Sequence, residues 1–416
     1  MIQKINNYIK NQLYTFSLYI RKAAGTVVLL IIARYLSVYD YGLFSSYKSI
    51  AAFLLIFANL GFADYILVSS KANIHEVKLK ITLFLTYAII LVLLVLTGCY
   101  FYKFESKILF ALILLRTFFD ITFFALILPY FQATKRFNTI GIINIIYSFG
   151  TILIAIVSYN FKLSLLEFLV LSIILGGINL IHCSFYAKLN YTLLFNYPKR
   201  IILKLDKKIL HFISVAIIAY LYNQVAPLFI ATFVDKTQAA LFFAAYTIAN
   251  IVMLLISAQT QKMVPEMIKN TVSNIRKILY KNLRFIILVT SVLFLFMFIF
   301  GKLVLKLVYG QDYYMNGYWV LLILMLSNIA LAESSIFGAH IVASNNVNKA
   351  LPILLQTSGI TILSLFILKN FGIYGAAISY FIASIYLAYK YTVYSNKLLK
   401  QQEQLENIKE TTCNNN

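Results

Sequence analysis

Ionisable side chains lie inside segments that are otherwise apolar enough to cross a membrane. The stretch LILLRTFFDITFFALILP, Leu112 to Pro129, carries Arg116 and Asp120 near its middle. A lone charge at the bilayer centre costs at least about 2.5 to 3.5 kcal/mol on insertion scales, so such residues normally face a partner or a hydrated cavity. Arg116 and Asp120 are four residues apart and share one helix face. Either they neutralise each other and orient the helix, or Arg116 contacts an anionic group of a ligand.

The first two apolar segments carry more cations. Arg21 and Lys22 lie about ten residues inside the first segment, and Arg34 lies at its far end. The Arg34 side chain either extends to the membrane surface or has a binding role. Lys48 lies on the second segment, which offers no acid near its depth. Asn59 returns within about 20° of Lys48 on a helical wheel, so the two belong to one polar stripe. Such a stripe requires water or polar neighbours.

The second half of the chain repeats part of this pattern. LFSSYKSIA (Leu43 to Ala51) aligns without gaps on LFFAAYTIA (Leu241 to Ala249), 198 positions later. By this repeat, the face that bears Lys48 corresponds to a face that bears Asn250. We therefore expect both faces to line a hydrated cleft between two related halves. Hydrogen bonding between helices is the alternative for each polar residue alone.

The balance of these buried charges is positive and predicts a negatively charged substrate. Asp120 and Glu333 are the two acids; each is a candidate for coupling transport to protons or sodium, or a partner for a cation. No cofactor is expected, and the cysteines Cys99, Cys183 and Cys413 are too scattered to predict a disulfide framework or a metal site. The candidate substrate-binding residues are Arg21, Lys22, Arg34, Lys48, Asn59, Arg116 and Asn250.

These residues must be positioned by membrane-spanning helices. Of the 416 residues 61% are hydrophobic and only 12% are charged, against roughly 25% charged in soluble domains. The apolar stretches are continuous and about 20 residues long, which favours helices over the alternating strands of a barrel. Twelve spans are expected: 12–36, 42–66, 79–102, 108–131, 138–159, 165–189, 210–234, 239–262, 285–308, 318–343, 350–369 and 373–395.

The spans predict an all-α polytopic membrane protein with two six-helix lobes. The longest connection surrounds Asp206, which places an N-terminal lobe at 1–203, a C-terminal lobe at 204–395 and a polar tail at 396–416. Because each lobe has an even number of spans, both enter the membrane from the same side and form parallel repeats. The first apolar segment is longer than a signal-peptide core, so we expect it to be retained as a helix.

A net charge of +22 is compatible with a nucleic-acid partner, but the distribution of the basic residues along the chain favours another explanation for this charge. Most Lys and Arg residues fall on the termini and on alternate connections, which is the positive-inside pattern, so both termini are expected in the cytoplasm. No nucleic-acid partner is expected. Two basic segments, YPKRIILKLDKK and KNTVSNIRKILYKNLR, are also suited to contact anionic lipid headgroups.

Three segments resemble the bacterial polysaccharide flippases, and the resemblance covers about residues 10 to 395. LIIARYLSVYDYGLFSSYKSIAAFLLIFANLGF (Leu30 to Phe62) is similar to the opening of that family, ATFVDKTQAALFFAAYTIA to its turn between helices 7 and 8, and NFGIYGAAISYFIAS to its helix 12. Members of the family often have Gly in the turn between helices 7 and 8, where this chain has Ala239 and Ala240. The family belongs to the superfamily of multidrug, oligosaccharidyl-lipid and polysaccharide exporters.

The resemblance implies a fold and a function. The fold is the MATE-like pair of six-helix lobes arranged as a V. The function is transfer of undecaprenyl-pyrophosphate-linked oligosaccharide units across the bacterial inner membrane by alternating access, for O-antigen, lipopolysaccharide or capsule biosynthesis. A glycan polymerase and chain-length machinery are the implied protein partners. The residues at cationic cavity positions of this family are Arg21, Lys22, Arg34, Lys48 and Arg116.

Other classes of function compete with this interpretation. A cation-coupled multidrug or small-molecule exporter of the same fold predicts a cavity dominated by acids and aromatic residues. A glycan polymerase or glycosyltransferase, which would be an enzyme, usually needs a sizeable external loop, and the longest here has about nine residues. A lipid II flippase of the same superfamily usually has additional spans. We therefore expect a transporter without covalent chemistry.

Overall fold

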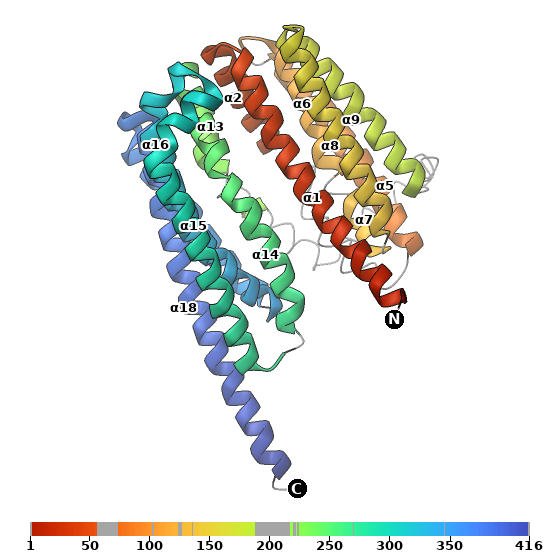
Figure 1. Ribbon diagram of the computed structural model, residues 1–416, viewed down its shortest axis with the longest axis vertical. Coiled ribbons are helices and arrows are strands. Elements are labelled where there is room, and N and C mark those ends of the chain that lie inside the picture. Colours follow the sequence, from red (N-terminus) through yellow and green to blue (C-terminus); the bar gives the residue numbers. More distant parts are fainter. Residues whose placement is uncertain are drawn as a thin grey trace. The chain divides into compact units, whose positions relative to one another are not determined.

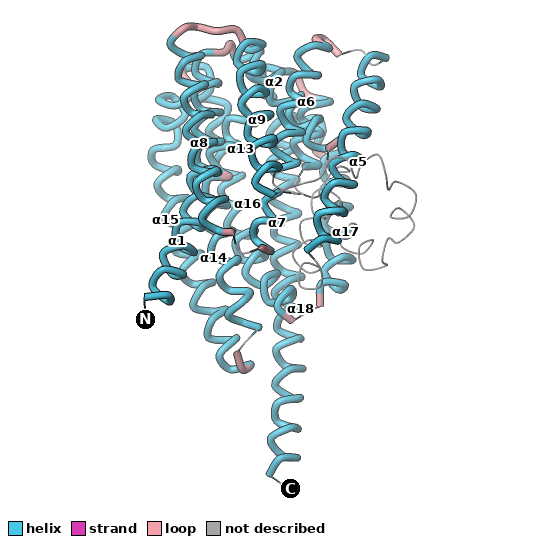
Figure 2. Tube along the Cα trace, turned by 90° about the vertical axis from the view of Figure 1, so that its right-hand side faces the viewer, coloured by secondary structure: helices cyan, strands magenta, loops and turns pink. Residues whose placement is uncertain are grey.

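The chain folds into helices throughout the part that is described. The computed structural model describes residues 2–55, 74–101, 104–123, 127–134, 136–187, 217–218, 222, 224–268, 270–344 and 346–414. Every element in these ranges is helical (Figure 2). The chain divides into two compact units, Met1–Gln224 and Val225–Asn416. The connection around Asp206, where the sequence predicts the division, lies outside the described residues.

The first unit is built from neighbouring long helices. Its elements are α1 (Ile2–Tyr35), α2 (Val38–Leu54), α5 (Ile74–Phe101), α6 (Lys107–Thr122), α7 (Leu128–Ala133), α8 (Phe137–Asn160) and α9 (Leu165–Ala187). Within this unit α1 packs along α8, α8 packs against α9, and α6 contacts both α2 and α9 (Figure 1). These contacts bring α1, α6 and α8, whose sequences carry the charged and polar residues, into one bundle.

The second unit is organised around one buried helix. Its elements are α13 (Lys236–Ala249), α14 (Ile251–Ile268), α15 (Val272–Tyr309), α16 (Gln311–Ala343), α17 (Val347–Ile367), the 3-10 turn η3 (Lys369–Phe371) and α18 (Gly372–Asn414). Helix α16 contacts α13, α14, α15 and α18. In the most apolar window of α16 67% of the residues are buried, whereas in that of α15 only 11% are. Helix α15 therefore presents an apolar face outward.

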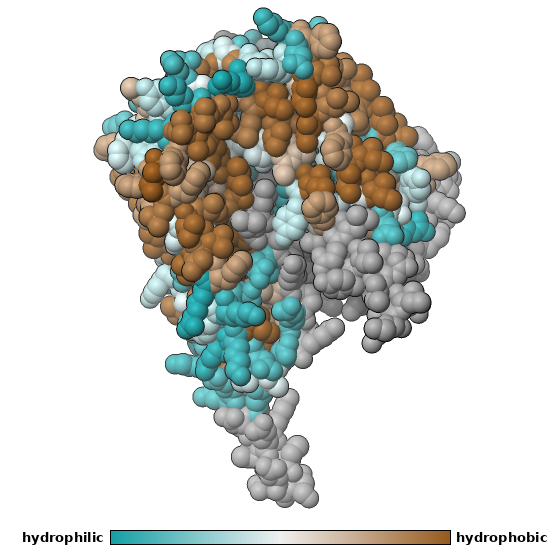
Figure 3. Space-filling view, in the orientation of Figure 1, coloured by the Kyte–Doolittle hydropathy of each residue, from teal (hydrophilic) through white to brown (hydrophobic). Residues whose placement is uncertain are grey.

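The described helices confirm the all-α membrane fold. Six segments are long and apolar enough to cross a bilayer: Phe137–Asn160, Leu165–Ala187, Val272–Tyr309, Gln311–Ala343, Asn348–Ile367 and Lys369–Glu406. Figure 3 shows broad apolar surfaces on the face in view. Many large apolar side chains of these helices are exposed, among them Phe185, Ile299 and Phe366, which agrees with contact with lipid.

The internal repeat is visible in how two helices begin. Helix α2 starts at Val38 and α13 at Lys236, again 198 positions apart. Each follows a capping side chain: the Ser37 hydroxyl accepts the Asp40 amide, and the Asp235 carboxylate accepts the Thr237 and Gln238 amides. These bonds satisfy N–H groups that the first helical turn cannot pair. The two halves therefore enter the matching helix by the same chemistry.

A second repeated turn follows the two Asn-Phe pairs of the sequence. Lys162 and Gly372 each come directly after Asn-Phe, and both have a positive φ, 50° and 54°. Gly372 adopts this conformation without steric cost, whereas Lys162 is the one non-glycine residue with positive φ in the described chain. One turn later, a Cβ on Gly375 would overlap the carbonyl oxygen of Leu368. Glycine is thus required where α18 passes the end of α17.

One expected span is interrupted, which corrects the sequence prediction. The span predicted at 239–262 breaks at Asn250, where the Met253 amide bonds to the Asn250 oxygen instead of continuing the α-helical ladder. The released Ala249 carbonyl accepts the Asn328 side-chain amide of α16 at 2.7 Å, so a side chain inserted into the ladder explains the break. The span predicted at 108–131 contains α6, which ends at Thr122, and α7, which begins at Leu128, and residues 124–126 between them lie outside the described residues.

Candidate functional site

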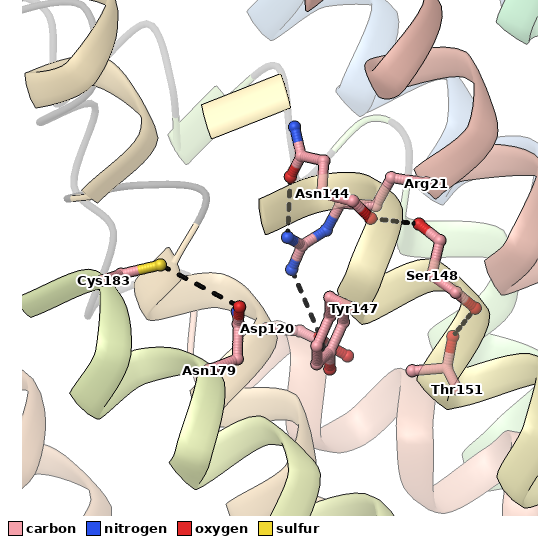
Figure 4. Close-up of polar contacts among 8 residues, drawn as sticks. All are labelled: Arg21, Asp120, Asn144, Tyr147, Ser148, Thr151, Asn179 and Cys183. Carbon is pink, nitrogen blue, oxygen red and sulfur yellow. Dashed lines mark hydrogen bonds and ion pairs between the residues drawn. The ribbon is translucent and has the colours of Figure 1, made fainter. Parts of the chain in front are cut away.

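A charged cavity lies within the first unit, between α1, α6 and α8. Its volume is about 240 Å³. It is lined by Arg21, Lys22, Gly25, Val28, Arg116, Asp120, Tyr147, Ser148 and Thr151. Four of the residues predicted from the sequence, Arg21, Lys22, Arg116 and Asp120, therefore meet at one place. Figure 4 shows the polar contacts on its α8 side.

Arg21 is the most deeply buried cation of this cavity, with 6% of its surface exposed. Its Nη1 donates to the Asn144 Oδ1 at 2.9 Å, and its Nη2 lies 4.0 Å from the Asp120 Oδ1. The guanidinium also lies over the rings of Phe123, at 3.8 Å, and Tyr147, at 4.4 Å. Hydrogen bonding, an ion pair and two aromatic faces together offset the removal of this charge from water.

Asn144 positions Arg21 from α8. It is fully buried, and its Nδ2 donates to the Ser17 hydroxyl at 3.4 Å while its Oδ1 accepts from Arg21. The oxygen and the nitrogen of the Asn144 side-chain amide therefore both form hydrogen bonds with residues of α1. One turn further along α8, Ser148 donates to the Asn144 carbonyl at 2.6 Å, and Thr151 donates to the Ser148 carbonyl at 2.8 Å. The hydroxyls of α8 thus bond within their own helix.

Asp120 is shared by two side chains on different helices. Its Oδ1 accepts the Tyr147 hydroxyl at 2.9 Å and forms the ion pair with Arg21 (Figure 4). Its side chain remains 41% exposed. The carboxylate therefore holds a cation and a phenol while one side of it faces the cavity.

Arg116 does not form the pair with Asp120 that the sequence allows. Its guanidinium lies over the Phe168 ring of α9 at 5.0 Å, while Asp120 turns toward α1 and α8. Within the described part of the chain, the buried Nη1 of Arg116 has no hydrogen-bond acceptor. Buried N–H groups on a charged side chain are normally paired with protein or ordered water. This donor could therefore accommodate a further acceptor.

Two lysines add positive charge near Arg116 and Asp120. Lys22 is exposed and lines the cavity. Lys48, on α2, is also exposed and lies close enough to Arg116 and Asp120 for their charges to interact. The cavity wall itself contains Arg21, Lys22 and Arg116 against Asp120, so its net charge is positive.

The remaining candidates lie elsewhere. Arg34 is exposed in the last turn of α1, and Asn59 lies outside the described residues. In the second unit, Asn250 is half-buried at the break after α13 and its side chain bonds to Tyr246. Glu333 of α16 is half-buried and accepts the Thr392 hydroxyl of α18 at 2.8 Å.

Helix α8 contributes two residues that were not predicted from the sequence. Tyr147 and Asn144 hold Asp120 and Arg21, yet neither was a candidate. A signal existed, because Asn144, Ser148 and Thr151 recur every three to four residues on a strongly apolar helix and so define one polar face. No group of three or more potential metal ligands occurs among the described residues.

Comparisons with known proteins agree with this picture. Residues 31–316, more than half of the chain, match the family described as "Polysaccharide biosynthesis protein". The chain belongs to this polysaccharide biosynthesis family. No curated protein matches it in sequence.

Solved structures show that this chain has the MATE fold. A multidrug resistance MATE transporter of the MOP superfamily, in an inward-facing conformation, is 13% identical with a TM-score of 0.70, over 92% of this chain and 96% of that one. A MATE in complex with MaD3S is 13% identical with a TM-score of 0.65, over 96% of each chain. A MOP superfamily transporter from Pyrococcus furiosus, described as having a binding pocket of reverse polarity, is 13% identical with a TM-score of 0.65, over 95% and 96%. The predicted MATE-like fold class is confirmed.

Proposed function

We propose that this member of the polysaccharide biosynthesis family is a flippase for undecaprenyl-pyrophosphate-linked oligosaccharide units. The observation that carries the proposal is the cavity with three cations and one acid, in which the buried Arg116 Nη1 has no acceptor among the described residues. A pyrophosphate supplies anionic oxygens for such a donor, and charge-assisted hydrogen bonds of this kind are among the strongest in proteins. A cationic drug would meet net repulsion in the same cavity.

The residues have distinct roles in this proposal. Arg116 binds a phosphate oxygen, and Lys22 and Lys48 supply further positive charge on exposed side chains. Arg21 is held by Asn144 and Asp120, so it contributes charge from a fixed position. The polyprenyl tail stays in lipid while the headgroup crosses, and the protein alternates between access from the cytoplasm and from the periplasm. The chain would reside in the bacterial inner membrane with both termini in the cytoplasm.

Asp120 is the proposed site of coupling to protons. Protonation would remove its ion pair with Arg21, which would leave the guanidinium available to the substrate. Each protonation cycle would thereby change the number of cations available in the cavity. Glu333 is the second candidate, although its hydroxyl partner Thr392 carries no charge to release.

Deletion of the gene tests the proposed function. We expect surface glycan to be lost and a lipid-linked oligosaccharide to accumulate on the cytoplasmic leaflet, where an added membrane-impermeant glycosidase cannot reach it in intact spheroplasts. Wild-type protein expressed from a plasmid should restore both. Unchanged carrier lipids together with lost drug resistance would instead establish the cation-coupled exporter of the same fold.

A further inference from the structure

The second unit contains a basic groove of its own. It runs between the first turns of α15 and the C-terminal part of α18 and has a volume of about 730 Å³. It is lined by Ser273, Arg276, Lys277, Tyr280, Lys281, Arg284 and Glu403. Four cations therefore face one acid.

The acid of this groove is already engaged. Arg276 Nη2 lies 3.0 Å from the Glu403 Oε1, and the Glu406 carboxylate accepts the Val272 backbone amide at the start of α15. These two contacts attach α18 to α15 and fix the walls of the groove.

The other three cations of the groove are exposed and uncompensated. In the described part of the chain, Lys277, Lys281 and Arg284 have no ion-pair partner. They recur every three to four residues and so share one face of α15. A negatively charged ligand would compensate their charge.

The same face of α15 becomes apolar directly after Arg284. Phe285 is 58% exposed and Leu288 is 64% exposed, and the exposed stripe continues through Val292 and Leu295. In Figure 3 the hydrophilic surface at the lower ends of α15 and α18 lies directly beneath the apolar surface of this unit. A ligand that satisfies both surfaces must have a negative headgroup joined to an apolar chain.

We propose that this groove binds an anionic phospholipid from the surrounding membrane. Its phosphate would lie against Lys277, Lys281 and Arg284, with Tyr280 at the level of the headgroups, where aromatic side chains are favoured. Its acyl chains would lie along the stripe from Phe285 to Leu295. Free phosphate has the charge but lacks the apolar part. The proposal is independent of what the protein transports.

Direct lipid binding to the purified full-length protein tests the proposal. Native mass spectrometry in a non-ionic detergent would measure binding of phosphatidylglycerol and of the zwitterionic phosphatidylcholine. We expect the wild-type protein to bind phosphatidylglycerol at least tenfold more tightly, and inorganic phosphate at the same concentration not to displace it. Equal affinity for the two lipids, or full displacement by phosphate alone, would overturn the proposal.

Charge variants test the residues. The triple variant Lys277→Gln, Lys281→Gln, Arg284→Gln should lose at least tenfold in affinity for phosphatidylglycerol, and Glu403→Gln should bind it more tightly because the competing acid is gone. The matched control is the triple variant Lys302→Gln, Lys306→Gln, Lys369→Gln, which removes the same charge elsewhere in this unit and should stay within twofold of wild type.

Two results would contradict the assignment of the groove. One is an equal loss of affinity in both triple variants, since binding would then follow net charge alone. The other is an equal loss in the charge-preserving variant Lys277→Arg, Lys281→Arg, Arg284→Lys. Size-exclusion chromatography and circular dichroism establish that each variant is folded.

Discussion

Arg116 and Asp120 lie one turn apart on α6, but their side chains contact different helices. Asp120 meets Arg21 of α1 and Tyr147 of α8, whereas Arg116 lies over Phe168 of α9. A neutral pair would have removed both charges from the cavity. The observed arrangement uses the acid to hold one buried arginine and leaves the other available to a ligand.

Replacement of Arg116 should abolish transport without preventing folding. Arg116→Ala removes a donor whose Nη1 has no hydrogen-bond acceptor among the described residues, so little structure is lost. We expect surface glycan to fall at least tenfold in a complemented deletion strain, with protein levels in the membrane unchanged. Arg116→Lys keeps the charge and should retain partial activity, since an ammonium binds phosphate as a point charge. Full activity of Arg116→Ala would remove this residue from the site.

Replacement of Asp120 should separate coupling from structure. Asp120→Asn keeps an oxygen that can accept the Tyr147 hydroxyl and should leave the melting temperature nearly unchanged, while transport loses its dependence on the proton gradient. Asp120→Ala removes the carboxylate that contacts both Arg21 and Tyr147, so the buried Arg21 charge loses its ion pair with Asp120 and we expect about 1 to 3 kcal/mol of destabilisation. Thermal unfolding in detergent measures the second effect, and transport in proteoliposomes with and without a pH gradient measures the first. Gradient dependence that persists in Asp120→Asn would exclude coupling at this residue.

Removal of the Tyr147 hydroxyl tests its bond to Asp120. Tyr147→Phe keeps the ring under the Arg21 guanidinium and loses one hydrogen bond to a charged acceptor, worth about 1.5 to 3 kcal/mol when buried and less at this partly exposed carboxylate. We expect Tyr147→Phe and Asp120→Ala to be non-additive in unfolding experiments, because each removes the same hydrogen bond. Strictly additive effects would mean that the hydroxyl and the carboxylate act independently.

Glycine substitutions test the turn between α17 and α18. Gly375→Ala places a Cβ on the Leu368 carbonyl, which forces the backbone to shift, and we expect about 1 to 3 kcal/mol of destabilisation. The matched control is Gly359→Ala on α17, where a Cβ meets no atom within 4 Å and the higher helix propensity of alanine should stabilise by up to about 1 kcal/mol. Melting temperatures of the two variants should therefore move in opposite directions. Equal shifts would show that the approach of Leu368 does not constrain this turn.

The existence of the helices could be predicted from the sequence, because apolar length is a local property. The predicted spans 42–66 and 239–262 begin a few residues after α2 and α13 do, because apolar length does not register the polar caps Ser37 and Asp235. The break at Asn250 could not be predicted in this way, since its cause is the Asn328 side chain on a different helix. A repeat of nine residues located Asn250 on a polar face but said nothing about its partner.

The charged residues show the same division between local and distant causes. Burial cost alone predicts that Arg21, Arg116 and Asp120 require partners, which is why they could be selected as candidates. Spacing on one helix suggested the wrong partner for Asp120, because Arg21 approaches it from another helix, 99 positions earlier in the chain. The roles of Tyr147 and Asn144 depend on the packing of α1 against α8, which no periodicity reveals.

The contacts of Arg21 have a consequence for biosynthesis. Asn144, which accepts a hydrogen bond from the Arg21 guanidinium, is translated 123 residues later. This is a delay of about 6 to 25 s at ordinary rates of translation. During that interval α1 leaves the ribosome with a cation and without the groups that solvate it. We therefore expect α1 to stay beside the translocon, or near the membrane surface, until α6 and α8 emerge to enclose it.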